Sequence, residues 1–297
     1  MSQNRDNTIL AIALSMLALV LFDLMGLIIK RMSGTYSAAE LSAWRNLFGL
    51  IPSVIALYST RSWHKSGRPL KIRQWGLALG RGVLVSFAQF LYYYALGVMA
   101  FATATTITYA NALFMTALAI PILGERVGPV RWAAVLIGFA GVVWVMNPGS
   151  DAFSIVSLAP LAAAFLYALA GVTARKLDPE LPSGLVNLYS AVAALVSAAI
   201  LALSTTGFSP IASTEDMLWI IAMGGFGGTA VFCLVVSFRM TEQSNLAPFS
   251  YFGIPIAFAL GWFFYEEAPF ADLFPGAILI VAGGLLVVWR ERRLKQG

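Results

Sequence analysis

Two residues of opposite charge lie inside long apolar runs, where ionisable side chains are rare. Asp23 lies about two helical turns from the end of the first run, and Arg45 lies at a similar depth in the second. A charge within a membrane span costs about 2.5–3.5 kcal/mol on insertion scales, so each is a candidate functional group. Arg45 could receive a substrate carboxylate, and Asp23 could take an ammonium group or a proton. The alternative is an ion pair between them that holds the two helices together.

Uncharged polar side chains near the middle of other runs extend this candidate site. Gln89, Thr108 and Asn111 form hydrogen bonds without the cost of a permanent charge, which suits recognition of a zwitterion. Tyrosines add aromatic surface, which suits an apolar amino-acid side chain and equally suits a drug. The predicted substrate-binding residues are Asp23, Arg45, Gln89, Tyr93, Thr108, Tyr109, Asn111, Tyr167 and Tyr251. Tyr93 belongs to a triplet, residues 92–94, for which an aromatic belt at the membrane surface is the rival explanation.

The sequence lacks the residue sets of an enzyme or a metal site. The single histidine, His64, lies in a basic loop, and the single cysteine, Cys233, lies in an apolar run. Neither a Ser-His-Asp arrangement nor a metal cluster can be assembled from them. The glycines of residues 224–228 lack the Lys and Ser/Thr of a phosphate loop and predict a close helix crossing instead. We therefore expect no metal and no cofactor, and a membrane enzyme acting on lipid is the less favoured alternative.

The composition indicates that lipid is the solvent for much of the surface. Hydrophobic residues make up 59% of the 297 residues and charged residues 11%, too few charges to cover a soluble domain. The net charge is +5, but the basic residues are scattered through short loops, so nucleic acid is not an expected partner. Apolar runs of about 20 residues cross the hydrocarbon layer. We predict an all-α membrane protein with ten transmembrane helices, at 9–30, 39–58, 75–97, 100–122, 130–147, 153–175, 184–204, 217–238, 246–265 and 271–289.

The positive charges predict which side of the membrane each loop faces. If both termini are cytoplasmic, the cytoplasmic segments hold 15 Lys and Arg residues, and the outer loops hold only Lys30 and Arg31. The other two of the 19, Arg45 and Arg81, lie within spans, and Arg81 is close enough to the surface to snorkel. This split follows the positive-inside rule. We therefore expect a multi-pass protein of a bacterial inner membrane with cytoplasmic N- and C-termini.

A weak internal repeat divides the chain into two halves. A shift of 142 residues aligns Tyr109 with Tyr251 and Glu125 with Glu267. The predicted domains are the halves 1–148 and 149–297, with five spans each. Five is an odd number, so the second half enters the membrane in the opposite orientation. Two inverted repeats around a central cavity are typical of transporters, because exchange of the halves' conformations alternates access to a site at the midplane.

Three segments of each half resemble a known transporter family. The run 104–109, followed by Leu123-Gly124-Glu125-Arg126 and by residues 138–142, resembles the EamA-type repeat of the drug/metabolite transporter superfamily. The second copy is similar but carries Tyr265-Glu266-Glu267 where the family usually has Leu-Gly-Glu. The chain as a whole is most similar to the YddG-type exporters of aromatic and other amino acids. This resemblance implies ten spans, cytoplasmic termini, a central cavity and export without a nucleotide-binding domain.

The leading hypothesis is a secondary exporter of amino acids, aromatic and other neutral ones favoured, or of related small metabolites, by alternating access. A multidrug exporter of lipophilic compounds is the second transporter hypothesis. Phosphorylated substrates would need several basic residues deep in the cavity, and only Arg45 and Arg81 lie within spans. Proton coupling through Asp23 and facilitated export both stay open. The oligomeric state stays open as well, and a monomer is compatible with the sequence.

Overall fold

The computed structural model describes residues 2–59, 63–64, 67, 70–124, 128–146, 155–178, 181–240, 246, 249–267 and 270–296, and the regular structure in these ranges is entirely helical. The main helices are α1 (Ser2–Met32), α2 (Ala38–Tyr58), α4 (Trp75–Val98), α5 (Phe101–Thr108), α6 (Asn111–Leu123), α7 (Pro129–Met146), α8 (Leu158–Ala174), α9 (Ser183–Thr205), α10 (Thr214–Met240), α12 (Gly253–Tyr265) and α14 (Gly276–Gln296). The 3₁₀ turn η1 (Ile155–Ser157) precedes α8, and the short α13 (Phe270–Leu273) precedes α14. The all-α prediction is therefore confirmed.

Several of these helices are long enough to cross a membrane. By length and composition alone, five helical segments qualify: Ile9–Met32, Phe101–Leu123, Ile155–Ala174, Gly184–Thr205 and Thr214–Ser237. Three shorter apolar helices accompany them, at Trp132–Met146, Gly253–Tyr265 and Gly276–Leu286. The predicted total of ten spans stays a prediction.

Local sequence accounts for where α2 begins and α6 ends. The hydroxyl of Ser37 accepts a hydrogen bond from the Glu40 backbone N–H at 3.3 Å, and the Glu40 carboxylate accepts one from the Ser37 backbone N–H at 2.8 Å. This reciprocal capping box satisfies backbone donors that the start of a helix leaves unpaired. At the end of α6, Gly124 has a φ of +71°, a left-handed conformation that favours a residue without a Cβ atom.

The fourth predicted span, 100–122, is two helices rather than one. α5 and α6 meet at Tyr109 and Ala110. Around this point the hydrogen bonds tighten to the 3₁₀ pattern, from Ala110 N to Ile107 O and from Leu113 N to Ala110 O, both at 3.0 Å. The helix axis is therefore interrupted in the middle of the bundle.

A second interruption lies at the corresponding place in the other half of the chain. Tyr251 and Phe252 form a turn immediately before α12, and Ile254 N donates to Tyr251 O at 3.1 Å. A shift of 142 residues carries Tyr109 onto Tyr251. Each half therefore has a tyrosine at its helix break.

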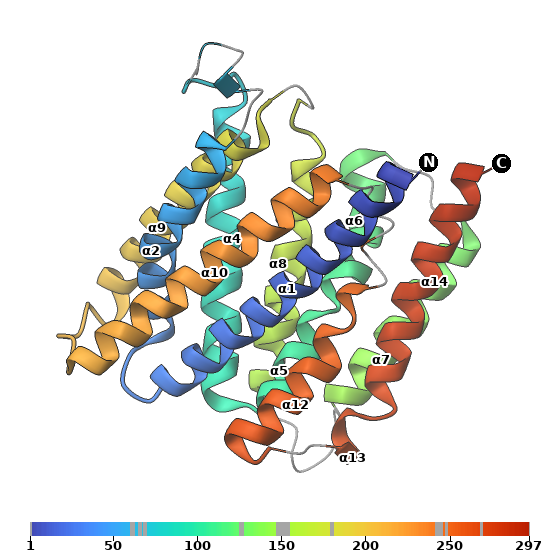
Figure 1. The fold of residues 1–297 in the computed structure, drawn as a ribbon. Coiled ribbons are helices and arrows are strands. Elements are labelled where there is room, and N and C mark those ends of the chain that lie inside the picture. Colours follow the sequence, from blue (N-terminus) through green and yellow to red (C-terminus); the bar gives the residue numbers. More distant parts are fainter. Residues whose placement is uncertain are drawn as a thin grey trace.

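Helices of the first half pack mainly against helices of the second half. α1 packs on α10, α2 on α9 and α10, α4 on α8 and α9, α5 on α12, and α7 on α14 (Figure 1). Counted from the start of each half, with α5 and α6 as one, the first helix meets the third of the other half. The second meets the second, and the last meets the last. Two copies related by a two-fold axis would produce this reciprocal pairing.

The crossing of α10 over α2 depends on glycine. A Cβ atom at Gly224 would collide with the Cβ of Phe48, and one at Gly228 would lie 2.6 Å from the Cγ of Pro52. The close helix crossing predicted for residues 224–228 is therefore confirmed.

The bundle has two ends that differ in how they are held. We call the end where α1 ends and α2 begins the α1–α2 end, and the opposite end, where α2 ends and α4 begins, the α2–α4 end. α1 begins and α14 ends at the α2–α4 end, so both termini lie on the same side (Figure 1). An even number of crossings puts the termini on one side, in agreement with the prediction of ten.

An ion pair joins distant segments at the α1–α2 end. Lys30 Nζ lies 2.8 Å from one carboxylate oxygen of Glu267 and donates to the Met99 carbonyl at 2.6 Å. The other Glu267 oxygen accepts from the backbone N–H of Phe101, at the start of α5, at 2.8 Å. Glu267 thus caps one helix and links it to another. Glu125, its predicted counterpart in the repeat, lies outside the described residues.

Candidate substrate cavity

A cavity of about 470 Å³ lies in the middle of the bundle, between helices of both halves. Its lining consists of Leu19, Phe22, Asp23, Met25, Arg45, Asn46, Gly49, Ser53, Arg81, Val85, Gln89, Tyr92, Tyr93, Thr105, Thr108, Tyr109, Asn111, Tyr167, Asn187, Ser190, Ala191, Ala194, Gly228, Val231 and Leu234. On α2, α9 and α10 the lining extends toward the α2–α4 end, as far as Ser53, Asn187 and Leu234. The volume falls within the usual range of small-molecule sites.

One part of the wall, the Arg45 group, consists of Arg45, Asn46, Gln89 and Tyr93. Arg45 Nη1 donates to Asn46 Oδ1 at 3.0 Å, and Nη2 donates to the Gly227 carbonyl at 3.4 Å. Asn46 Nδ2 in turn donates to Gln89 Oε1 at 2.8 Å, which joins α2 to α4. Tyr93 is 1% exposed, and its hydroxyl has no hydrogen-bond partner in the described part of the chain. The hydrogen bonds hold Arg45, Asn46 and Gln89 in one arrangement.

A second part of the wall, the Asp23 group, consists of Asp23, Tyr92, Thr105 and Tyr109. Asp23 is 4% exposed, and within the described ranges its Oδ2 atom has no hydrogen-bond partner. Asp23 lines the same cavity as Tyr92 and Tyr109. Tyr92 and Thr105 share a hydrogen bond of 3.0 Å between their hydroxyls. A buried carboxylate without a partner favours a ligand that brings a cation or a donor.

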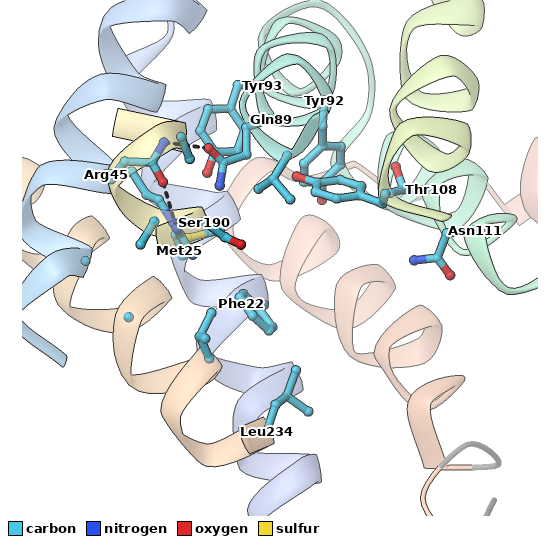
Figure 2. Close-up of a pocket in the computed structure, with 18 of the residues that line it drawn as sticks. Phe22, Met25, Arg45, Gln89, Tyr92, Tyr93, Thr108, Asn111, Ser190 and Leu234 are labelled. Carbon is cyan, nitrogen blue, oxygen red and sulfur yellow. Dashed lines mark hydrogen bonds between the residues drawn. The ribbon is translucent and has the colours of Figure 1, made fainter. Parts of the chain in front are cut away.

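The two groups meet at adjacent tyrosines, and further polar side chains lie across the cavity. Tyr92 of the Asp23 group and Tyr93 of the Arg45 group have ring centroids 6.1 Å apart. Figure 2 shows Arg45, Gln89 and Tyr93 together on one side and Thr108 and Asn111 on the other. Thr108 Oγ1 is bonded to the Ala104 carbonyl of its own helix at 2.9 Å. A ligand that spans the cavity can therefore meet polar side chains on both sides.

Asp23 and Arg45 do not form the ion pair that the sequence suggested as an alternative. The ion pairs found among the described residues are Lys30–Glu267 and Arg31–Glu215. The Arg45 guanidinium is instead held by Asn46 and by the backbone of α10. Asp23 and Arg45 therefore line the same cavity without pairing with each other.

The tyrosines at the two helix breaks contact each other. Tyr109 lines the cavity, and its ring centroid lies 6.3 Å from that of Tyr251. A Cβ atom at Gly253 would collide with the Tyr109 hydroxyl, and one at Gly284 with the Tyr251 hydroxyl, so glycine makes room for both rings. Tyr251, predicted from sequence as a binding residue, is not among the lining residues. It is buried behind Tyr109 and supports it.

The other predicted residues come together, and further ones join them. The cavity is lined by Asp23, Arg45, Gln89, Tyr93, Thr108, Tyr109, Asn111 and Tyr167. That they bind substrate stays a prediction. Sequence reasoning missed Asn46, Ser53, Arg81, Tyr92, Thr105, Asn187 and Ser190. Helical spacing could have found several of them, because Asn187 and Ser190 are three residues apart and so lie on one face of α9.

Arg81 also lines the cavity, which the prediction of a snorkelling residue did not include. Its Nε donates to the Ala170 carbonyl at 2.9 Å, and its side chain is half-buried. The reason is that α8 packs on this face of α4 and offers a carbonyl acceptor inside the bundle. The lining thus includes two arginines and one aspartate.

Sequence comparison identifies the family. The model of the EamA-like transporter family matches the chain twice, over residues 9–147 and 154–289. The chain belongs to the EamA-like transporter family. The two matches account for the internal repeat seen at a shift of 142 residues. The protein is therefore a multi-pass membrane transporter of a small molecule and not an enzyme, and the EamA-type resemblance is confirmed.

The names of similar proteins mention several different solutes. The chain is 26% identical over 244 residues to an S-adenosylmethionine uptake transporter of Rickettsia bellii, covering 82% of this chain and 80% of that one. It is 26% identical over 227 residues to a riboflavin transporter of Brucella anthropi, covering 75% and 80%. It is 25% identical over 279 residues to a pseudopaline exporter of Pseudomonas aeruginosa, covering 93% of each chain. Family membership alone therefore specifies neither solute nor direction.

A solved structure supports the fold. One crystal structure matches with a TM-score of 0.65 and 21% sequence identity, covering 96% of this chain and 98% of the other. At that identity the match bears on the fold alone.

Proposed function

We propose that this protein is a secondary transporter of amino acids, or of metabolites that contain an amino-acid group, working by alternating access. The observation that carries the proposal is that Arg45 and Asp23 line one cavity without pairing with each other. An α-amino acid brings a carboxylate, which suits the guanidinium fork of Arg45, and an ammonium group, which suits Asp23. The rings of Tyr92, Tyr109 and Tyr167 offer aromatic surface to the remaining side chain.

The names of the relatives support this substrate class in part. S-adenosylmethionine is itself an α-amino acid that carries an aromatic purine, so the same features of the cavity would serve it. The direction of transport in the proposal is export, which was predicted from sequence by resemblance to YddG-type exporters, whereas the S-adenosylmethionine relatives are named as uptake transporters. A relative named as a pseudopaline exporter is consistent with export in this family.

The proposed mechanism requires two inverted halves, residues 1–148 and 149–297, with five spans each. The reciprocal packing of the helices and the position of both termini at one end support this arrangement. In such a protein the site lies between the halves, and exchange of their conformations opens one side and closes the other.

The basic loops assign the sides of the membrane in the proposal. The α2–α4 end, with both termini, is cytoplasmic by the positive-inside rule. The cavity extends toward that end, so in the proposal this arrangement is the one that receives substrate from the cytoplasm of a bacterial cell, with the α1–α2 end closed.

A multidrug exporter of lipophilic cations is the second candidate. Phe22, Met25 and Leu234 give the cavity a partly apolar lining, and Asp23 alone would balance a cation. On this reading Arg45 would be dispensable, which separates the two candidates.

Counterflow in proteoliposomes tests the proposal. We expect saturable exchange of labelled L-phenylalanine or L-tryptophan, with competition by S-adenosylmethionine. Arg45→Met should lower the apparent affinity about 10- to 100-fold, because it removes hydrogen bonds to a charged group. Asp23→Asn should remove dependence on a pH gradient if Asp23 carries protons, and leave it unchanged in facilitated export. Exchange of a lipophilic cation without any exchange of amino acids would contradict the proposal in favour of the second candidate.

A further inference from the structure

We infer that the Arg45 group is a carboxylate subsite in which Gln89 presents its amide nitrogen to the cavity, held in that orientation by Ser42 and Asn46. The inference deepens the proposed function and rests on it for the substrate class. It assigns a donor role to Gln89 and a positioning role to two residues that do not themselves need to touch the substrate.

The orientation of the amides follows from the chemistry of arginine. A guanidinium has only donors, so the atom of Asn46 that faces Arg45 Nη1 at 3.0 Å must be the carbonyl oxygen. The nitrogen of Asn46 then faces Gln89 at 2.8 Å, and the atom of Gln89 that meets it must be an oxygen. Turning either amide round would set two donors against each other. The donor-to-acceptor direction of these hydrogen bonds, from Arg45 through Asn46 to Gln89, therefore follows from the arginine alone.

A third residue reinforces this orientation. The Ser42 hydroxyl also donates to Gln89 Oε1, at 3.1 Å, so the oxygen accepts two hydrogen bonds. Ser42, Asn46 and Gln89 are 1%, 2% and 4% exposed, so no bulk water competes for these bonds. Because the amide oxygen of Gln89 is buried and already accepts two hydrogen bonds, the amide nitrogen is the group that Gln89 directs to the cavity.

The polar groups that this wall offers to the cavity include unpaired donors. Gln89 Nε2 makes no hydrogen bond in the described part of the chain, and the guanidinium of Arg45, which also lines the cavity, carries only donors. Gln89 lies beside Arg45 and Tyr93 in Figure 2. A cation next to an unpaired amide N–H suits a ligand group that only accepts, and an ionised carboxylate is such a group in an amino acid. The amino acid would then lie with its carboxylate at α2 and α4 and its ammonium toward Asp23.

The test compares ligands that carry one charge each. The probes are 3-phenylpropionate, which has the carboxylate without the ammonium, and phenethylamine, which has the reverse, bound to the purified chain in detergent micelles. Gln89→Glu replaces the donor by an acceptor of the same shape. It should lower the affinity for 3-phenylpropionate about 10- to 100-fold relative to the affinity for phenethylamine. Gln74→Glu, the same change in the exposed connection before α4, is the matched control and should leave the ratio of affinities unchanged.

The positioning role is tested by Asn46→Asp and Ser42→Ala. An aspartate at position 46 still accepts from Arg45 but can only accept from Gln89, so Gln89 must turn its oxygen to the cavity. Asn46→Asp should therefore shift the acid-to-amine ratio in the same direction as Gln89→Glu, and Ser42→Ala should shift it by a smaller factor. Ser42→Ala also serves if Gln89→Glu does not fold. A variant that does not fold would bind both probes more weakly. The ratio of the two affinities therefore reports the orientation of Gln89 and not the stability of the protein.

The outcomes separate this inference from the proposed function. A wild-type chain that does not bind 3-phenylpropionate, or a Gln89→Glu variant that binds phenethylamine with an unchanged ratio, would overturn the subsite. Binding of 3-phenylpropionate that depends on Gln89, without any exchange of amino acids in liposomes, would keep the subsite and overturn the amino-acid proposal.

Discussion

The two ends of the bundle are held together in different ways. At the α1–α2 end, one cluster of buried apolar side chains joins α1, α2, α4, α5, α10 and α12, with Tyr36, Leu96 and Phe101 fully enclosed. Toward the α2–α4 end, the buried residues of α1 and α10 form one cluster around Ala18 and Ala230. Those of α2, α4 and α9 form another cluster around Leu57. The cavity extends into this divided end.

Polar contacts strengthen the same contrast. At the α1–α2 end, Lys30 is paired with Glu267, Tyr36 is bonded to Asp216, and Glu40 accepts from the backbone of Ser209. Each of these contacts joins segments more than 160 residues apart. In the proposed alternating-access mechanism, this continuous core and these contacts form the closed gate, and opening it requires that the contacts break together. The difference between the two ends therefore makes the α1–α2 end the place to test the proposal.

The largest effect should follow from Glu267→Ala. It removes the partner of Lys30 and the cap of α5, each a hydrogen bond to a charged group of about 1.5–3 kcal/mol. We expect the α1–α2 end to open more often. In a background with Cys233→Ala, a cysteine at the buried Ala95 should react with a polar maleimide at least about tenfold faster. A cysteine at Ala191, in the cavity, should not react faster.

The neighbouring carboxylate provides the control for this prediction. Glu266→Ala removes an acidic side chain next to Glu267 that is in neither ion pair found among the described residues, and the labelling rate at position 95 should stay near the wild-type value. Equal acceleration by both variants would mean that Glu267 does not hold this end closed.

A smaller effect is expected from Tyr36→Phe. The Tyr36 hydroxyl donates to Asp216 at 2.9 Å and accepts from the Ala212 backbone N–H at 3.0 Å, and the side chain is 1% exposed. The change deletes both hydrogen bonds, one of them to a charged group, and should cost about 1–3 kcal/mol of unfolding free energy. The melting temperature in detergent should fall by several degrees. Tyr94→Phe, on the 46% exposed Tyr94, should leave it unchanged, and an equal fall in both would contradict the assignment.

At the divided end, Ser53→Ala should have a smaller effect still. It removes the 3.2 Å hydrogen bond from Asn187, which joins α2 to α9 beside the cavity. A neutral hydrogen bond contributes about 0.5–1.5 kcal/mol, so the thermal stability should fall slightly. The labelling of a cysteine at Ala95 should not change, because this contact does not belong to the closed gate. Faster labelling would show that the two ends are coupled through this bond.

The smallest effect is expected from Arg31→Gln. The Arg31–Glu215 pair has an N–O distance of 2.9 Å, close to the 2.8 Å of the Lys30–Glu267 pair. Its side chains, however, are 57% and 66% exposed. Exposed pairs contribute about 0–1 kcal/mol and are screened by salt. Melting temperatures at low and high salt should therefore differ little between this variant and the wild type. A fall as large as that of Glu267→Ala would mean that exposure does not distinguish the two pairs.

Much of the architecture follows from local patterns in the chain. Apolar runs predicted the main helices with ends that differ by up to seven residues, since a membrane span needs about 20 apolar residues whatever its neighbours are. The break between α5 and α6 at Tyr109 was not predicted, because it involves no proline and no glycine. The glycines at 224 and 228 predicted a close crossing, and the sequence could not say that Phe48 and Pro52 are what they approach.

The candidate site shows where sequence reasoning stops. Polar residues inside apolar runs stand out from sequence alone, because burying them in lipid is costly, and eight of the nine predicted residues line the cavity. Their partners could not be predicted, because a hydrogen bond such as Asn46–Gln89 joins residues 43 positions apart on different helices. Only the packing of α2 on α4 decided that Arg45 is held by Asn46 and not by Asp23. The sequence by itself thus determined which groups must be satisfied inside the membrane, and the tertiary structure decided which of them are left to a substrate.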